Sequence, residues 1–115
     1  MASVDWSYHR PGCISCKRTQ EFLAKHSIAE AEQVNAKKTK YERDAALGLL
    51  DGVDNLYVTR GKKTLHFDLK NDRPDDDEIA AVILGRSGTL RAPVLRKGKT
   101  LIVGFTEEAF EKVLT

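Results

Sequence analysis

Two kinds of hydrophobic pattern follow one another in the first third of the chain. Apolar and polar residues alternate over Val4–His9, and this period of two predicts a strand. After a Pro-Gly break, apolar residues return at helical spacing, which predicts a helix from Cys13 to about His26. A second short strand is predicted over Ala31–Asn35. The N-terminal part therefore has the order strand, helix, strand.

The middle of the chain is predicted to be mainly helical. Thr39 is a suitable N-cap for a helix that runs through Leu50, and the Asp-Gly pair that follows ends it. Residues 56–69 alternate like two strands around a central turn, but they also fit a loop with a short helical turn, and both interpretations stay open. The acidic run 72–78 precedes an apolar segment that ends at Leu84. This order predicts a helix with acids in its first turn, where the helix dipole favours them.

The last part of the chain predicts a hairpin and a helix. Pro93–Leu95 and Thr100–Val103 are two short strands joined by a basic turn that contains a glycine. Thr106 can then cap a final helix anchored by Phe110 and its apolar neighbours. The predicted elements suit the α/β class, with a central mixed sheet flanked by helices.

Length and composition bound the function classes. The chain has 115 residues, which fits a single domain over residues 1–115, and 41% of them are hydrophobic, enough for a core. No stretch approaches the ~18 apolar residues of a membrane span, and the first residues lack the pattern of a secretory signal, so we expect a cytoplasmic protein without a membrane partner. The net charge of +2 gives no strong attraction to nucleic acid, and we interpret the two short lysine- and arginine-rich runs as solvated surface.

The two cysteines carry the most informative chemistry, because they stand three residues apart as Cys13-Ile14-Ser15-Cys16. A disulfide bond between Cys13 and Cys16 would close a very short loop and add little stability, because the entropic effect of a disulfide grows with the length of the loop that it closes. Structural zinc usually needs four ligands, and the chain has no third cysteine, so we expect no metal site. Cysteines that only fill the core are the remaining structural interpretation. In the cytoplasm a CxxC pair at a strand end favours redox or nucleophilic use.

Three features would favour the thiolate at Cys13. The start of a helix directs unpaired backbone N–H groups toward its sulfur. Lys17 adds positive charge one turn further along, and His9 at the strand end can share or take the thiol proton. Cys16 lies one turn along the helix, where it can attack a mixed disulfide formed on Cys13 and so serve as the resolving thiol.

The motifs together resemble the arsenate reductase/Spx branch of the thioredoxin-like superfamily. The segments that carry the resemblance are Tyr8-His9-Arg10-Pro11-Gly12-Cys13, Arg91-Ala92-Pro93-Val94-Leu95 and Leu101-Ile102-Val103-Gly104-Phe105. The resemblance covers nearly the whole chain. It implies a thioredoxin-like fold with a central mixed four-stranded sheet and a helical insert between its second and third strands.

The resemblance also implies roles for single residues. Cys13 falls on the nucleophilic cysteine of the family, His9 on a histidine that some members keep beside it, and Pro93 on a cis-proline. The arsenate reductases clamp their oxyanion with an arginine directly before that proline and with another near the end of the following hairpin. Ala92 stands at the first place and residues 101–115 contain no arginine, so we expect the chain not to reduce arsenate.

The Spx side of the resemblance implies an alternative function. Gly52, Arg60 and Arg91 follow the pattern of that group, and Cys16 matches its second cysteine. Such proteins use CxxC as an oxidation switch and bind the alpha subunit of RNA polymerase. The sequence thus leaves two functions open: a thiol–disulfide oxidoreductase acting on protein or glutathione disulfides, and a redox-switched regulator that binds RNA polymerase. It implies no bound cofactor, with glutathione, a thioredoxin or a glutaredoxin as co-substrate.

Overall fold

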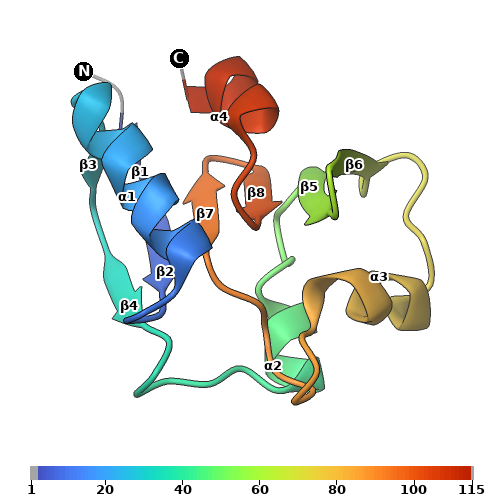
Figure 1. Cartoon of the computed structure of the whole chain (residues 1–115). Coiled ribbons are helices and arrows are strands. Elements are labelled where there is room, and N and C mark those ends of the chain that lie inside the picture. Colours follow the sequence, from blue (N-terminus) through green and yellow to red (C-terminus); the bar gives the residue numbers. More distant parts are fainter. Residues whose placement is uncertain (1–2, 115) are drawn as a thin grey trace.

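A computed structural model describes residues 3–114 of the chain (Figure 1). The strands are β1 (Ser3–Val4), β2 (Trp6–His9), β3 (Ala29–Glu30), β4 (Gln33–Asn35), β5 (Asn55–Arg60), β6 (Lys63–Asp68), β7 (Val94–Lys97) and β8 (Thr100–Val103). The helices are α1 (Ile14–Lys25), α2 (Arg43–Gly48), α3 (Asp76–Ile83) and α4 (Glu107–Leu114). Six of the strands form one mixed sheet in the order β4-β2-β7-β8-β5-β6, while β1 pairs with β3. The predicted mixed sheet flanked by helices is confirmed.

The sheet is larger than the four strands that the sequence led us to expect. Four strands, β4-β2-β7-β8, are adjacent, and β5 adds to β8 in parallel. The ambiguous segment 56–69 is a hairpin: β5 and β6 pair antiparallel from Asn55 opposite Asp68 to Arg60 opposite Lys63. Gly61, with φ 62°, allows the tight turn between them. The expected insert is therefore a hairpin with a helix on each side of it in sequence, and it extends the sheet to six strands.

The strand predicted over Val4–His9 is interrupted at Asp5. The Asp5 carboxylate accepts a hydrogen bond from Gly98 N at 2.7 Å, and its own N–H donates to Arg96 O at 2.8 Å. This bend separates β1 from β2 and moves Val4 into a different hydrophobic cluster from Tyr8. The predicted alternation of apolar and polar residues holds within β2, but its polar side is also buried, because Ser7 and His9 are 0% and 7% exposed.

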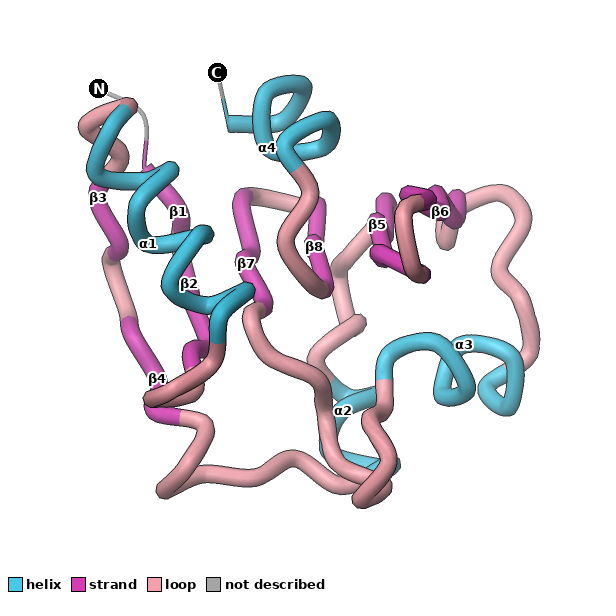
Figure 2. The backbone as a smooth tube through the Cα atoms, viewed as in Figure 1, coloured by secondary structure: helices cyan, strands magenta, loops and turns pink. Residues whose placement is uncertain are grey.

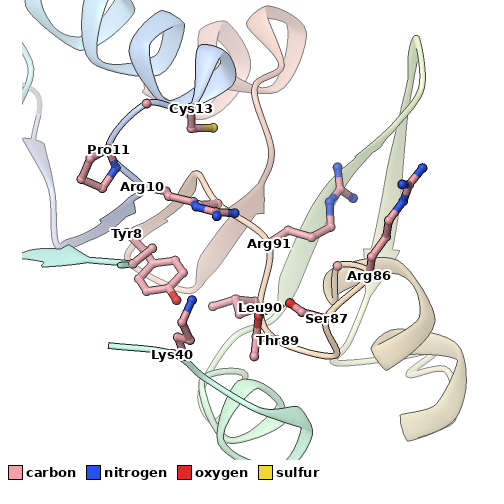
Figure 3. Close-up of a pocket in the computed structure, with 14 residues that line it drawn as sticks. Tyr8, Arg10, Pro11, Cys13, Lys40, Arg86, Ser87, Thr89, Leu90 and Arg91 are labelled. Carbon is pink, nitrogen blue, oxygen red and sulfur yellow. Dashed lines mark hydrogen bonds between the residues drawn. The ribbon is translucent and has the colours of Figure 1, made fainter. Parts of the chain in front are cut away.

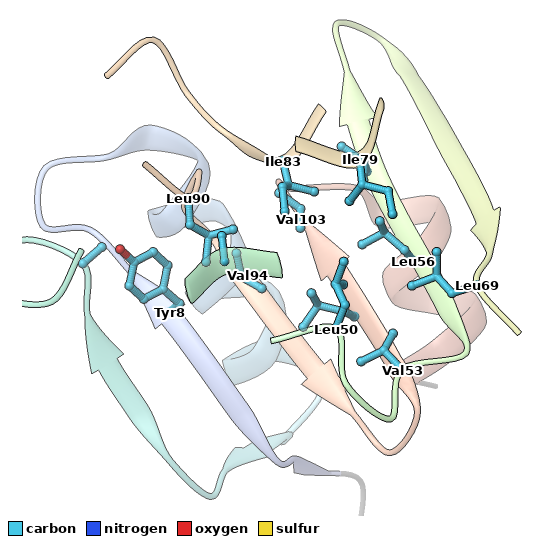
Figure 4. Packing of buried hydrophobic residues seen from close by; sticks show 14 residues of the cluster. Tyr8, Leu50, Val53, Leu56, Leu69, Ile79, Ile83, Leu90, Val94 and Val103 are labelled. Atoms are coloured by element: carbon cyan, nitrogen blue, oxygen red, sulfur yellow. The ribbon is translucent and has the colours of Figure 1, made fainter. Parts of the chain in front are cut away.

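Helices cover both faces of the sheet. On one face, α1 and α4 pack against Leu95, Ile102 and Tyr57. On the other, Leu50 from the turn after α2 and Ile79 and Ile83 from α3 join a larger cluster that includes Tyr8, Leu56, Val58, Val94 and Val103 (Figure 4). Figure 1 shows α1 and α4 on one side of the strands and α2 and α3 on the other. Both faces of the central strands are therefore buried, and side chains gain solvent access mainly where strands end.

The helix predictions hold in part. The helix predicted from Cys13 is α1, with Cys13 as its N-cap, and Thr106 caps α4 as predicted by accepting a hydrogen bond from Ala109 N at 3.2 Å. The prediction that Thr39 caps α2 is wrong, because that helix begins only after Glu42. The Thr39 carbonyl instead accepts a hydrogen bond from the Tyr8 hydroxyl at 2.8 Å, which holds residues 36–42 as a loop along the sheet (Figure 2). Within residues 3–114, no helix has both the length and the apolar character needed to cross a bilayer.

Candidate functional site

Cys13 and Cys16 lie at the point where β2 gives way to α1. The chain turns at Pro11-Gly12, and Gly12 takes the left-handed conformation with φ 79°. Cys13 then enters the helix as its N-cap, and its sulfur accepts a hydrogen bond from Cys16 N at 3.3 Å. Both cysteines are free thiols. The predicted placement of Cys13 at a helix start is confirmed, and the first sulfur is held by the backbone of the second cysteine.

Cys16 is the buried member of the pair. Its side chain is 2% exposed, and its sulfur accepts a hydrogen bond from Arg10 N at 3.2 Å. Burial, reinforced by the neighbouring Cys13 sulfur, raises the pKa of the Cys16 thiol to about 12, although the Arg10 N–H opposes this shift. Cys13 is partly exposed. The two thiols therefore differ in access, which suits an outer thiol that meets a partner and an inner thiol that follows it.

His9 is buried beneath α1 and pairs with a residue that the sequence analysis missed. Its Nε2 lies 2.8 Å from Glu30 Oε2, and the two side chains are only 9% and 14% exposed. Glu30 comes from β3, just after α1. A signal for this pair exists in the sequence: the helix that links two parallel strands covers one face of the first, so a histidine on that face needs a polar partner. The predicted effect of His9 on Cys13 stays a prediction.

Two open cavities meet at Cys13. One, of about 710 Å³, lies between α1 and β4, and its lining includes His9, Cys16 and Lys17. The other, of about 720 Å³, lies between the Cys13 loop and the loop before Pro93. Figure 3 shows this second cavity, with Cys13 at one rim and cationic side chains around it. Those cations are Arg10, Lys40, Arg86 and Arg91, and its lining contains no carboxylate. A partner that reaches Cys13 through this cavity therefore meets positive charge.

The segment before β7 faces the cysteine loop across this second cavity. The Ala92–Pro93 peptide is cis, as the resemblance implied, and Pro93 O accepts a hydrogen bond from Gly104 N at 2.7 Å. Arg91 and Ala92 line the cavity that Cys13 also lines. The loop before Pro93 therefore lies across this cavity from Cys13.

The sequence comparisons agree with this geometry. The sequence model of the ArsC family matches residues 8–113. The chain belongs to the ArsC family. It is similar to the regulatory protein MgsR of Bacillus subtilis, with 27% identity over 101 residues that cover 85% of this chain and 80% of MgsR. It is also similar to the global transcriptional regulator Spx of Streptococcus mutans, with 26% identity covering 90% and 78% of the two chains, and to Spx 1 of Oceanobacillus iheyensis, with 28% identity covering 93% and 84%. Membership in the ArsC family confirms the thioredoxin-like fold.

Arg91 connects three segments of this ArsC-family chain through hydrogen bonds. Its guanidinium donates to Thr59 O at 2.8 Å, to Val82 O at 3.0 Å and to Thr59 Oγ1 at 3.3 Å. Partial burial lowers the pKa of Arg91. The guanidinium therefore joins the loop before Pro93 to β5 and α3, and most of its hydrogen-bonding capacity is already used.

The other residues expected to contact a partner lie at opposite edges of the sheet. In the strand register, Tyr8, Val94, Val103 and Val58 lie opposite one another on neighbouring strands. Cys13 lies beyond Tyr8, past the end of β2, and this end of β2 defines the cysteine edge of the sheet. Arg60, which ends β5, lies at this edge and lines a smaller cavity of about 270 Å³ with Arg86 and Arg91. Gly52 precedes β5 and lies beside Arg96, at the opposite edge. The structure thus brings Arg60 to the side of the cysteines and keeps Gly52 away from them.

No group of three or more histidine, cysteine, aspartate or glutamate side chains in the described part of the chain could hold a metal ion. The three aspartates at residues 75–77 lie at the start of α3, where Asp75 is the N-cap residue. This position agrees with the electrostatic interpretation of that acidic run.

Proposed function

We propose that the chain is a thiol–disulfide redox protein in which Cys13 is the nucleophile and Cys16 the resolving thiol. In the first step the Cys13 thiolate attacks one sulfur of a partner disulfide, and the second sulfur leaves as a thiolate. In the second step the Cys16 sulfur attacks Cys13, and the partner leaves as a thiolate while the Cys13–Cys16 bond forms. Two electrons pass from the cysteine pair to the partner, so the pair is oxidised and the partner reduced.

The observation that carries this proposal is the arrangement of the two sulfurs at the start of α1. Cys13 accepts the Cys16 N–H at 3.3 Å and opens on two cavities, whereas Cys16 is buried directly behind it. The helix N-terminus, Lys17 on one cavity and Arg10 on both supply positive potential where a thiolate develops. We propose glutathione, a thioredoxin or a glutaredoxin as the reductant that converts the Cys13–Cys16 disulfide back to two thiols.

The test is a redox titration of the reduced chain in glutathione buffers, with alkylation and mass measurement of each cysteine. The wild-type chain should form an intramolecular Cys13–Cys16 disulfide. Cys16→Ser should accumulate a mixed disulfide on Cys13, while Cys13→Ser should accumulate none. Ser15→Ala changes an exposed residue between the cysteines and should behave as the wild type. The proposal is wrong if the wild-type chain forms no internal disulfide.

A second function is favoured by the names of the relatives, which are a regulatory protein and global transcriptional regulators. In this alternative the same disulfide switches the binding of RNA polymerase, the partner that the resemblance to Spx implies. Reduced and oxidised chain would be compared for capture of the C-terminal domain of the polymerase alpha subunit. Arg60→Ala should weaken capture, whereas Lys62→Ala, in the turn after β5, is the matched loss of charge and should leave it unchanged. Equal absence of capture in both redox states rejects this function.

The expectation that arsenate is not a substrate is tested in the same preparations. Arsenate turnover in the presence of glutathione and glutaredoxin should be absent, because Ala92 offers no cationic donor beside Pro93.

A further inference from the structure

His9 holds a free proton acceptor inside the protein. A carboxylate only accepts hydrogen bonds, so the 2.8 Å contact with Glu30 Oε2 places the ring hydrogen on Nε2. In the neutral imidazole this leaves Nδ1 with an unprotonated lone pair. Nδ1 is buried and finds no hydrogen-bond partner among residues 3–114. A buried histidine that is fixed by a carboxylate on one nitrogen and unpartnered on the other has the arrangement of a general base.

Cys16 is the thiol that needs such a base. Its sulfur is desolvated, so the ordinary route to a thiolate, loss of the proton to bulk water, is suppressed at neutral pH. The same sulfur lies 3.2 Å from Arg10 N, on the residue that follows His9 directly. His9 and Cys16 also line the same cavity of about 710 Å³ between α1 and β4. Cys13, by contrast, is partly exposed and in contact with solvent.

Titratable and charged groups near His9 come from β3, the loop after β2 and the start of α1. Glu30 on β3 is the carboxylate in direct contact. The charged or titratable residues that line the shared cavity are Arg10 on the preceding loop and Cys13, Cys16 and Lys17 at the start of α1. The lining residues from β4 are uncharged. Glu30 is thus the acidic group positioned to stabilise a positive imidazolium.

We propose that His9 accepts the proton of Cys16 in the resolving step and that Glu30 orients the imidazole and stabilises its charged form. This inference rests on the proposed redox function. The Cys16 S–H proton passes to His9 Nδ1 through one water in the cavity that both side chains line, and the sulfur electron pair attacks Cys13 Sγ in the mixed disulfide. The Cys13–partner bond breaks, the partner leaves as a thiolate, and the imidazolium returns its proton to that thiolate or to water. The base therefore acts on the second step, whereas the sequence analysis assigned His9 to the first.

The experiment follows both steps on the full chain with 5,5′-dithiobis(2-nitrobenzoate). The first nitrothiobenzoate is released when Cys13 attacks the reagent, and the second when Cys16 resolves the mixed disulfide. In His9→Asn the second release should slow by at least ~10-fold at neutral pH, since general-base catalysis typically contributes ~10²–10⁴-fold. Its rate should then rise with hydroxide concentration across the pH range, whereas the wild-type rate should level off. The first release should keep its wild-type rate.

Glu30→Gln keeps the volume and an acceptor for Nε2 but removes the charge, so it should fold normally and slow the second release alone. Glu32→Gln removes an exposed carboxylate two residues away and is the matched control. Thermal unfolding of each variant reports on folding. Wild-type rates for the second release in both His9→Asn and Glu30→Gln would overturn the relay. Slowing of the first release alone would also overturn it and assign His9 to Cys13. A wild-type chain that releases only one nitrothiobenzoate would instead reject the proposed redox function itself.

Discussion

Gly104 follows β8 and donates a hydrogen bond from its N–H to the carbonyl of Pro93. Its replacement by alanine tests how closely Gly104 packs against Thr59. Gly104 has φ 91°, a conformation that L side chains rarely adopt. A Cβ built on it would overlap Thr59 Oγ1 and stand 3.1 Å from Thr59 Cβ. Thr59 is β-branched and its hydroxyl is near Arg91, so its side chain has little freedom to turn aside.

The expected loss of stability has two parts. A left-handed backbone costs a non-glycine residue ~1–2 kcal/mol. Insertion of a methyl group into a filled space costs a further ~1–3 kcal/mol. Gly104→Ala should therefore lower the free energy of unfolding by ~2–5 kcal/mol.

Gly98→Ala is the matched control. Gly98 has φ 58°, but a Cβ there would meet no atom within 4 Å. That variant should show only the backbone cost of ~1–2 kcal/mol. The stiffening of the unfolded chain by alanine is the same in both variants and cancels in the comparison.

The assay is urea unfolding with linear extrapolation, in wild type, both alanine variants, Thr59→Ala and the double variant Gly104→Ala/Thr59→Ala. In the Thr59→Ala background the cost of Gly104→Ala should shrink toward that of Gly98→Ala, which gives a coupling energy between the two positions. If Gly104→Ala costs no more than Gly98→Ala, or if Thr59→Ala gives no rescue, the close packing of Gly104 against Thr59 is refuted.

Three further predictions follow from the site. In native protein at pH 8, iodoacetamide should label Cys13 well before Cys16, because a thiol of pKa about 12 is almost entirely protonated there; equal labelling, measured by mass spectrometry, would contradict the burial of Cys16. The raised pKa also favours the neutral thiol in the folded state, so its contribution to stability is full below about pH 9 and decreases as the pH rises toward 12; urea unfolding between pH 8 and 11 should show a weaker fall for Cys16→Ala than for wild type. Arg91→Lys should lower the free energy of unfolding by ~1–3 kcal/mol, because the shorter lysine side chain has a single nitrogen and loses the two-nitrogen fork that bonds Thr59 O, Val82 O and Thr59 Oγ1 at once; an unchanged urea midpoint would show that this fork adds nothing.

Elements defined by neighbouring residues were predictable from the sequence. The hairpin of β7 and β8 needs a glycine at the turn, and Gly98 supplies it with φ 58°. The start of α1 follows from the Pro-Gly break and the helical spacing of the apolar residues after it. Both depend on contacts within a few residues, so the local pattern contains the information that decides them.

Features decided by distant residues were not predictable in this way. The bend at Asp5 is held by Gly98, 93 residues later in the chain. Thr39 lies in the loop three residues before Glu42, the N-cap of α2, and its carbonyl is bonded to Tyr8, 31 residues earlier. In the same way, the sequence singled out Arg91 but not its attachment to Thr59, 32 residues away. Periodicity and capping preferences describe the chain locally and carry no information about such pairs.

The same contrast between local motifs and distant contacts applies to the residues of the candidate site. The cysteine pair and the nearby proline were recognised from short motifs, and the structure places both at one edge of the sheet. Glu30 was missed because it belongs to no motif and becomes significant only when β3 brings it to His9.

The cap of α1 and the sulfur that we propose as the nucleophile are the same atom. The lone pairs that Cys13 offers to the amide of Cys16 are also the ones that form any new bond to sulfur. A new covalent bond to Cys13 Sγ therefore changes the hydrogen bond that stabilises the first turn of α1. The exchange rate of the Cys16 amide hydrogen then reports the covalent state of Cys13. A partner that touches this turn can sense oxidation without touching either thiol.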